Sequence, residues 1–239
     1  MKIKKRYAGI LFVMVLGYFL IYYALHSVEI YVPASTPQAD KKDFVIVIDA
    51  GHGGIDSGCS SLSGYEEKNI NLSILLKLRD MCESFGYTVV VTRDTDISIH
   101  DAGVTGIGNQ KRSDMDNRLE IFNKYENAVA ISIHQNLFTQ SQYKGAQMFY
   151  STNNPLNEKF ARIMQNEFVA QLQPDNTREI KSCGKELFLC YYSKCPTLMI
   201  ESGFLSNPEE AALLETDEYQ SMVAFTIFSG LNKFINQNM

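Results

Sequence analysis

The chain has 239 residues, with 22 Lys and Arg residues against 27 Asp and Glu residues, and its formal net charge is −5. This length allows one sizeable domain plus an appendage. The acidic balance argues against a nucleic-acid-binding protein, because such proteins present strongly basic faces, and the composition is that of an ordinary globular protein.

The first residues predict a membrane segment. Residues 1–6 (M-K-I-K-K-R) form a basic cluster, and residues 8–25 contain no charged side chain. The apolar core of a secretory signal has about 7–15 residues, whereas a spanning helix needs about 17–25. We therefore expect residues 1–27 to be an uncleaved signal anchor with its N-terminus in the cytoplasm. Cleavage at residues 32–34 (V-P-A), which would give a secreted protein, is the alternative. Either way, the remainder is expected to work outside the cytoplasm.

The rest of the chain predicts a linker followed by one α/β domain. Residues 28–43 contain Pro33 and Pro37 and are typical of a tether, and the domain is expected over residues 44–239. Short apolar runs predict strands at 44–49, 87–92, 128–133, 147–151, 187–192 and 197–200. Helical patterns cover 67–85, 113–126, 155–173 and 218–235. This alternation indicates a mostly parallel central sheet flanked by helices. The long loop 94–109 is of a kind that is often functional or mobile.

Polar side chains follow three of the predicted strands. His52 comes after the first strand in D-A-G-H-G-G-I-D, His134 follows the run A-V-A-I-S-I, and Glu201 ends T-L-M-I. In parallel sheets, ligands bind outside the carboxyl ends of the strands. We therefore expect these side chains to face one crevice. The glycine-rich loop around His52 lacks both G-x-G-x-x-G and the P-loop motif, which argues against a phosphate cradle.

Glu67 opens the first predicted helix on its inner stripe, together with Asn71, Ile74 and Leu78, whereas Glu66 falls on a wetter side. An inward carboxylate is costly unless it is paired, capped or bound to a metal. Considered alone, Glu67 is best explained as a first-turn residue in the favourable helix dipole. Together with His52 and His134 it favours a catalytic zinc site, which has three protein ligands, an open position and a nearby carboxylate.

Glu201 has two interpretations. A carboxylate at the end of a buried strand near a metal can take a proton from the attacking water and pass it to a leaving nitrogen. Alternatively, Glu201 is the salt-bridge partner of an interior arginine, and Arg118 is a candidate because it shares a helical stripe with Met115 and Phe122. Both hold if Arg118 orients a carboxylate from behind the metal ligands.

The motifs together resemble a known family. The stretches D-A-G-H-G-G-I-D-S-G, E-K-N-I-N-L, T-R-D-T-D, S-I-H-Q-N with Arg118 ahead of it, and I-E-S-G-F-L-S-N resemble the zinc-dependent N-acetylmuramoyl-L-alanine amidases of the amidase-3 type over about residues 44–236. The resemblance implies Zn²⁺ bound by His52, Glu67 and His134, with Glu201 as the catalytic carboxylate. It also implies hydrolysis of the amide between N-acetylmuramic acid and L-alanine in peptidoglycan.

A membrane segment followed by a bare catalytic domain is similar to the sporulation-type members of that family. That similarity implies removal of stem peptides from spore cortex, which leads to muramic-δ-lactam. The sequence shows no wall-binding repeat, so we expect the anchor, or an accessory or activating protein at the outer membrane face, to supply localisation.

One position departs from the family pattern, since Gln135 stands where alanine is common after the second zinc histidine. Gln135, Asn136 and Arg118 are candidates to support the metal ligands or contact substrate. Two other functions stay open: a zinc peptidase that cuts within the stem peptide, and a non-catalytic cell-wall-binding protein. The N-terminus of the released product separates amidase from peptidase, and the intact Glu201 argues against a protein without turnover.

Overall fold

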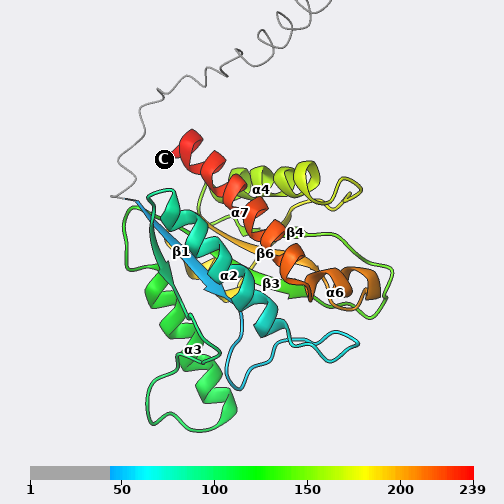
Figure 1. Ribbon diagram of the computed structural model, residues 1–239. Helices are drawn as coiled ribbons and strands as arrows, with labels where there is room; N and C mark the ends of the chain where they lie inside the picture. The colour runs from blue at the N-terminus through cyan, green and yellow to red at the C-terminus, as the bar shows by residue number, and fades with distance from the viewer. Residues whose placement is uncertain (1–43) are drawn as a thin grey trace, which may run out of the picture. The chain divides into compact units, whose positions relative to one another are not determined.

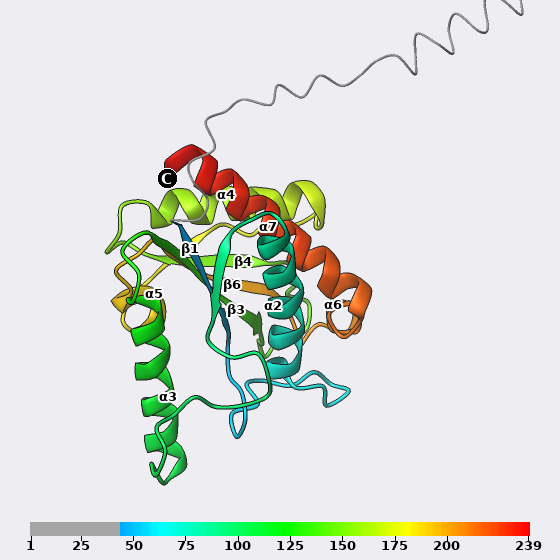
Figure 2. The same cartoon turned by 60° about the vertical axis from the view of Figure 1, so that its left-hand side comes forward.

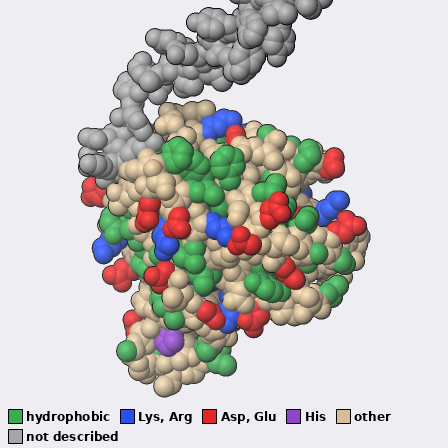
Figure 3. Space-filling model, in the orientation of Figure 1, with side chains coloured by type: hydrophobic (Ala, Val, Ile, Leu, Met, Phe, Trp, Pro, Cys, Tyr) green, Lys and Arg blue, Asp and Glu red, His purple; other side chains and the backbone are tan. Residues whose placement is uncertain are grey.

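The computed structural model describes residues 44–239; the predicted anchor and linker, residues 1–43, lie outside the described residues. Within residues 44–239, none of the helices combines the length and the apolar character needed to cross a bilayer. On the face that carries α2 (Glu67–Ser84) and α7 (Asp217–Asn238), acidic and basic side chains are interspersed with scattered apolar ones (Figure 3).

The described residues form one six-stranded sheet in the order β2-β1-β3-β6-β4-β5 (Figure 1). Its strands are β1 (Val45–Ala50), β2 (Thr88–Val91), β3 (Ala128–Asn136), β4 (Gln147–Ser151), β5 (Lys181–Cys183) and β6 (Thr197–Phe204). All neighbouring pairs are parallel except β4 and β6, which are antiparallel. The sheet is therefore mixed but mostly parallel, as the alternating pattern predicts.

Helices cover both faces of this sheet. In addition to α2 and α7, they are α3 (Ile107–Phe122), α4 (Asn157–Gln171), α5 (Phe188–Tyr192) and α6 (Pro208–Leu214). Figure 2 shows α3 and α5 on one side of the sheet, and α2 and α7 on the other. The larger apolar core lies under α2, α4 and α7, and a smaller one lies under α3 and α5.

The strand β1 shows why the sheet is buried on both faces. Ile46 and Ile48 belong to the larger core, and Val45 and Val47 belong to the smaller one. Successive side chains of a strand point to opposite faces, so a continuous apolar run is stable only when both faces are covered. The polar residues that follow such a strand emerge at its carboxyl end, which is where the candidate site lies.

Three local predictions were wrong. Within residues 187–192, predicted as a strand, Phe188–Tyr192 form the short helix α5, because a brief apolar run is compatible with either structure. The edge strand of this region is instead β5, whose sequence K-S-C carries no apolar signal. The helix α3 begins at Ile107, six residues before its predicted start at 113.

One further helix and one helix end also differ from the predicted pattern. The helix α6 was not predicted, although Asn207 caps it by accepting from the backbone N–H groups of Glu209 and Glu210 and Pro208 opens it. Phe85, predicted within the first helix, follows the end of α2 and is 58 % exposed, and its ring packs against Phe228.

Candidate metal and catalytic site

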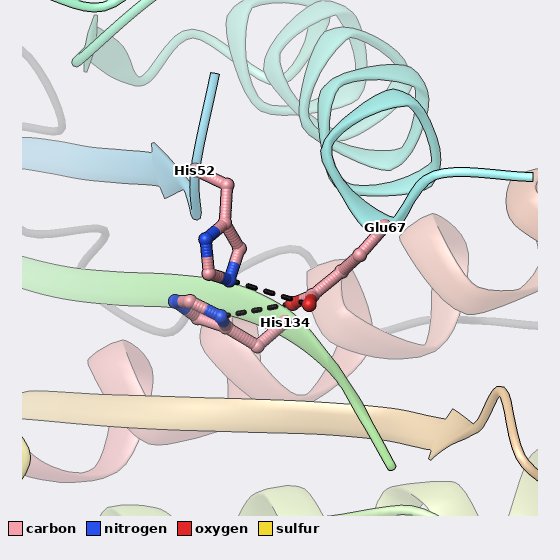
Figure 4. Close-up of side chains that lie close together, drawn as sticks. All are labelled: His52, Glu67 and His134. Atoms are coloured by element: carbon pink, nitrogen blue, oxygen red, sulfur yellow. Dashed lines mark hydrogen bonds and ion pairs between the residues drawn. The ribbon is translucent and has the colours of Figure 1, made fainter. Parts of the chain in front are cut away.

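Three side chains from separate elements converge at the carboxyl end of the sheet. His52 follows β1, Glu67 is the first residue of α2, and His134 lies near the end of β3. His52 Nε2 is 3.2 Å from Glu67 Oε2, and His134 Nδ1 is 3.0 Å from Glu67 Oε1 (Figure 4). One nitrogen or oxygen from each residue lies within 4.8 Å of the others. The three residues predicted to bind metal are therefore brought together.

The Glu67 carboxylate is buried and fully provided with hydrogen-bond donors. It accepts from the backbone N–H groups of Cys59 at 2.9 Å and Gln135 at 3.0 Å, and from Asn71 Nδ2 at 3.2 Å. Burial alone raises the pKa of Glu67, but the hydrogen bonds and charges of His134 and His52 outweigh it and lower the pKa well below its usual range. Glu67 is thus an anion at neutral pH. Glu66, which the helical pattern places on a wetter side, is partly exposed, and its carboxylate lies 3.4 Å from Lys68 Nζ.

The same pairing acts on His134. Burial alone lowers the pKa of His134, but the hydrogen bond and charge of Glu67 raise it to about 9. Protonated His134 is therefore paired with the anionic Glu67 in this arrangement. A metal ion binds the deprotonated groups, so it would replace the proton of His134 as the positive charge beside Glu67.

His52 is held by its side chain and by its backbone. Its Nδ1 lies 3.0 Å from Asp56 Oδ2, and Asp56 in turn pairs with Lys111 at 2.8 Å. A carboxylate on one ring nitrogen fixes the orientation of a metal-binding histidine, and here it leaves Nε2 facing Glu67. Asp56 lies in the same G-H-G-G-I-D motif but had no predicted role.

The backbone of His52 adopts φ 65°, which no other non-glycine residue within 44–239 shares. A positive φ is uncommon outside glycine and persists where the surroundings enforce it. Arg118 supplies that constraint, since its Nη2 donates to the His52 carbonyl at 2.7 Å and its Nη1 donates to the Ala50 carbonyl at 2.8 Å.

A second buried arginine, Arg93, completes the support of this loop. It donates to the carbonyls of Ala50 at 3.0 Å, Gly51 at 3.1 Å and Lys68 at 2.9 Å. Burial lowers the pKa of Arg93 to about 10, which still leaves it cationic at neutral pH. Arg93 stands in the T-R-D-T-D motif but had no predicted role, because its partners are backbone atoms that are distant in sequence.

Two glycines leave room for the metal-binding side chains. A Cβ atom at Gly51 would overlap the imidazole of His134. A Cβ at Gly58 would lie 2.5 Å from Glu67 Oε2 and 2.7 Å from His52 Cδ2. Any other residue at these two positions would displace the three side chains from one another.

Arg118 pairs with Asp49 and Asp114 rather than with Glu201. Its Nη1 is 2.5 Å from Asp49 Oδ1, and its Nε is 2.6 Å from Asp114 Oδ2. Burial alone raises the pKa of Asp49, but the Arg118 charge and the hydroxyls of Ser132 and Thr92 outweigh it and lower the pKa. The salt-bridge interpretation of Glu201 is therefore wrong.

Glu201 lies on β6, in register with His134 on the adjacent strand β3. The Oε2 atom of Glu201 is buried and has no hydrogen-bond partner among the described residues. Burial raises the pKa of Glu201 to about 7, with the charge of His134 lowering it and that of Glu67 raising it further. A carboxyl group with a pKa near neutrality can both accept and donate a proton.

The remaining predicted residues lie beside this group. Gln135 is buried, and its Nε2 donates to Asn71 Oδ1 at 3.1 Å. Asn136 ends β3, and its carbonyl accepts from the Leu205 N–H at 2.8 Å. His100 lies outside the group and contacts Ser98. A cavity of about 380 Å³ opens next to His52 and His134, lined also by Ile55, Lys111, Glu186 and Phe188.

Comparison with known proteins gives a consistent family. The family Amidase_3, described as N-acetylmuramoyl-L-alanine amidase, matches residues 46–233. The chain is 32 % identical over 237 residues to the germination-specific N-acetylmuramoyl-L-alanine amidase of Bacillus subtilis (strain 168), covering 99 % of this chain and 98 % of that protein.

Solved structures agree. The CwlD amidase from Clostridioides difficile, in complex with the GerS lipoprotein, superposes with a TM-score of 0.78 at 35 % identity, covering 82 % of this chain and all (100 %) of that one. An N-acetylmuramoyl-L-alanine amidase from Clostridium difficile 630 gives a TM-score of 0.72 at 25 % identity, covering 83 % of this chain and 100 % of that one.

The buried pair of Asp49 and Arg118 generates a stability prediction. Asp49→Asn removes one partner and leaves the Arg118 charge short of compensation in the interior, so we expect a loss of about 3–5 kcal/mol in the free energy of unfolding. Urea unfolding followed by circular dichroism measures it. Asp217→Asn, which removes the exposed pair with Lys77, is the control and should cost less than about 1 kcal/mol. Equal effects of the two substitutions would contradict the prediction.

Proposed function

The chain belongs to the N-acetylmuramoyl-L-alanine amidase family, and we propose that it is a zinc hydrolase that cuts the amide between N-acetylmuramic acid and L-alanine in peptidoglycan. One observation carries the zinc assignment: two imidazoles and one buried carboxylate converge within 4.8 Å, next to a carboxyl oxygen that has no partner within residues 44–239.

The donor set fits zinc. Two histidines and one glutamate with an open fourth position are a recurrent catalytic zinc site, whereas calcium and magnesium favour all-oxygen sites. Glu67 also needs a cation, because a buried carboxylate without one is strongly unfavourable. We assign His52, Glu67 and His134 as the zinc ligands. Zinc bound there would polarise the amide carbonyl and lower the pKa of a water molecule.

Glu201 is proposed to move the protons. Its unpartnered Oε2 would take a proton from the attacking water and then deliver it to the departing alanine nitrogen, as a general base that becomes a general acid. Neither step needs a covalent intermediate. Cys59 lies close by, but burial and the Glu67 charge raise the pKa of its thiol, so it does not supply a thiolate nucleophile at neutral pH.

Asn71 and Gln135 are proposed to support Glu67. Asn71 donates to both Glu67 and the Gly51 carbonyl, and Gln135 fixes the Asn71 amide by donating to its oxygen. Hydrogen bonds of this kind hold a metal-binding carboxylate in its orientation. Gln135, in place of the alanine that is common in the family, therefore adds a hydrogen bond to Asn71. An alanine side chain could not make this bond.

We also propose a role in sporulation and an extracytoplasmic location. The name of the Bacillus subtilis relative is germination-specific, and the CwlD amidase was solved with a lipoprotein. By analogy, this chain would strip stem peptides from spore cortex on the way to muramic-δ-lactam. Residues 1–27 would anchor it, and an accessory protein at the outer membrane face would assist it.

Substitution of Glu201 tests the proton-transfer assignment. Glu201→Gln keeps the shape of the side chain but removes its basicity, so we expect turnover to fall by about 10²–10⁴-fold. Zinc content, measured by mass spectrometry of the metal, should stay unchanged. Glu209→Gln on the exposed start of α6 is the matched control and should keep full activity. Undiminished turnover in Glu201→Gln would remove Glu201 from the mechanism.

The products of digestion test the reaction. Incubation of the protein with purified peptidoglycan should release peptides that begin with a free L-alanine and leave the glycan strands intact. A chelator should stop the release, and added zinc should restore it, because the ligands supply the only proposed metal site. Peptides that begin at a later residue would instead support the zinc peptidase alternative.

Gln135 offers a test that does not depend on turnover. Gln135→Ala frees the Asn71 amide, so we expect zinc affinity to fall by about tenfold or more. Competition with a fluorescent chelator measures that affinity. Gln140→Ala, at an exposed position beyond the end of β3, is the control. Unchanged zinc binding in Gln135→Ala would show that Gln135 does not support the ligands.

A further inference from the structure

A second hollow, of about 260 Å³, shares no lining residue with the cavity beside His52. It is lined by Asn136, Phe138, Gln147, Phe149, Arg178 and Lys181, among others. Gln147 on β4 is paired with Glu201 on β6, and Phe149 is paired with Met199. Met148 and Ile200 point into the larger core. Since successive side chains of a strand point to opposite faces, the residues on either side of them share the other face of the sheet: Gln147, Phe149, Met199 and Glu201. Gln147 and Phe149, which line the hollow, therefore lie on the same face of the sheet as the candidate catalytic carboxyl, and Gln147 is directly beside it.

Two basic side chains line this hollow. Arg178 Cζ lies 4.6 Å from the centroid of the Phe204 ring, and Lys181 Nζ lies 5.7 Å from that of Phe149. Arg178 also donates to Gln147 Oε1 from Nε at 3.2 Å and from Nη2 at 2.7 Å. Aromatic faces and one amide thus hold the two cations in place.

Neither cation is part of an ion pair among the described residues. Across residues 44–239, no carboxylate lies within ion-pair distance of Arg178 or Lys181. The cavity beside His52 differs, because its Lys111 is already paired with Asp56. An anionic part of the substrate is therefore attracted to the second hollow rather than to the first.

The spacing matches the substrate that the proposed function requires. Lys181 on β5 lies two strands across from Met199 on β6, which is two residues before Glu201. The usual strand separation and rise per residue then place the backbone of Lys181 about 12 Å from that of Glu201. In peptidoglycan, L-alanine is followed by D-glutamate joined through its γ-carboxyl group, so its α-carboxyl is free or amidated. The Cα atom of that D-glutamate lies about 4 Å from the Cα atom of the alanine. Long basic side chains bridge the remaining distance.

We propose that Arg178 and Lys181 bind the free α-carboxylate of the second stem-peptide residue and so make the enzyme selective for unamidated stems. This deepens the proposed function, on which it rests. The stem peptide then lies across β4 and β5, and the sugar occupies the cavity lined by Ile55 and Phe188. Guanidinium and ammonium groups donate charge-assisted hydrogen bonds to a carboxylate, and a carboxamide cannot replace that attraction.

The test compares two muramoyl peptides that differ only in a carboxylate or a carboxamide at this position. With the zinc-loaded full-length protein, we expect kcat/KM to favour the carboxylate by about tenfold or more, mainly through KM. Lys181→Gln should remove most of this preference by weakening the carboxylate substrate alone. Arg178→Gln should do the same, and Arg178→Lys, which keeps the charge, should restore part of it.

Lys159→Gln, which removes an exposed charge from α4 outside the hollow, is the matched control and should keep the preference. If Arg178→Gln fails to fold for want of its stacking on Phe204, the exposed Lys181 still carries the test. Equal hydrolysis of both substrates by the unaltered protein would overturn the inference and leave the amidase function standing.

Calorimetry with the product peptides separates the two proposals, because it needs no turnover. Tighter binding of L-Ala-γ-D-Glu than of its α-amide, lost in Lys181→Gln, would support the inference even if neither muramoyl peptide is cleaved. In that case only the proposed reaction would fail. Equal binding of the two peptides would overturn the inference, whatever the outcome of the hydrolysis assay.

Discussion

The burial of one guanidinium group governs the whole site. Arg118 is 1 % exposed, and its charge is compensated by Asp49 and Asp114 while its remaining donors bind the carbonyls of Ala50 and His52. A buried charge is tolerated only when every one of these partners is in place. The network therefore couples strand β1, helix α3 and the His52 loop, and it holds His52 in a backbone conformation that it would not adopt alone.

Two glutamates at this end of the sheet have opposite environments. Glu67 is surrounded by two imidazoles and three N–H donors, so its pKa is lowered and it stays an anion suited to a metal. The Oε2 atom of Glu201 is buried and has no partner among the described residues, and burial raises the pKa of Glu201 to about 7. Environments that drive two carboxyl pKa values apart also separate their roles, one holding a cation and the other moving protons.

The distribution of charge extends this contrast beyond the reacting atoms. Beside His52 the cation Lys111 is paired with Asp56, whereas Arg178 and Lys181 line a separate hollow and form no ion pair among the described residues. A substrate with a neutral sugar at one end and an anionic peptide at the other would be oriented by this difference. Peptidoglycan has that polarity about the amide that the family cleaves.

The sequence by itself determined the α/β class and the convergence of His52, Glu67 and His134, because apolar runs reveal buried strands and their carboxyl ends meet at one edge. It did not reveal α5, β5 or α6, whose short or exposed segments carry no clear periodicity. Only the tertiary structure paired Arg118 with Asp49 and placed Arg93 against three backbone carbonyls. Such partners are far apart in the chain, and backbone acceptors look the same in every sequence, so no pattern of side chains could identify them.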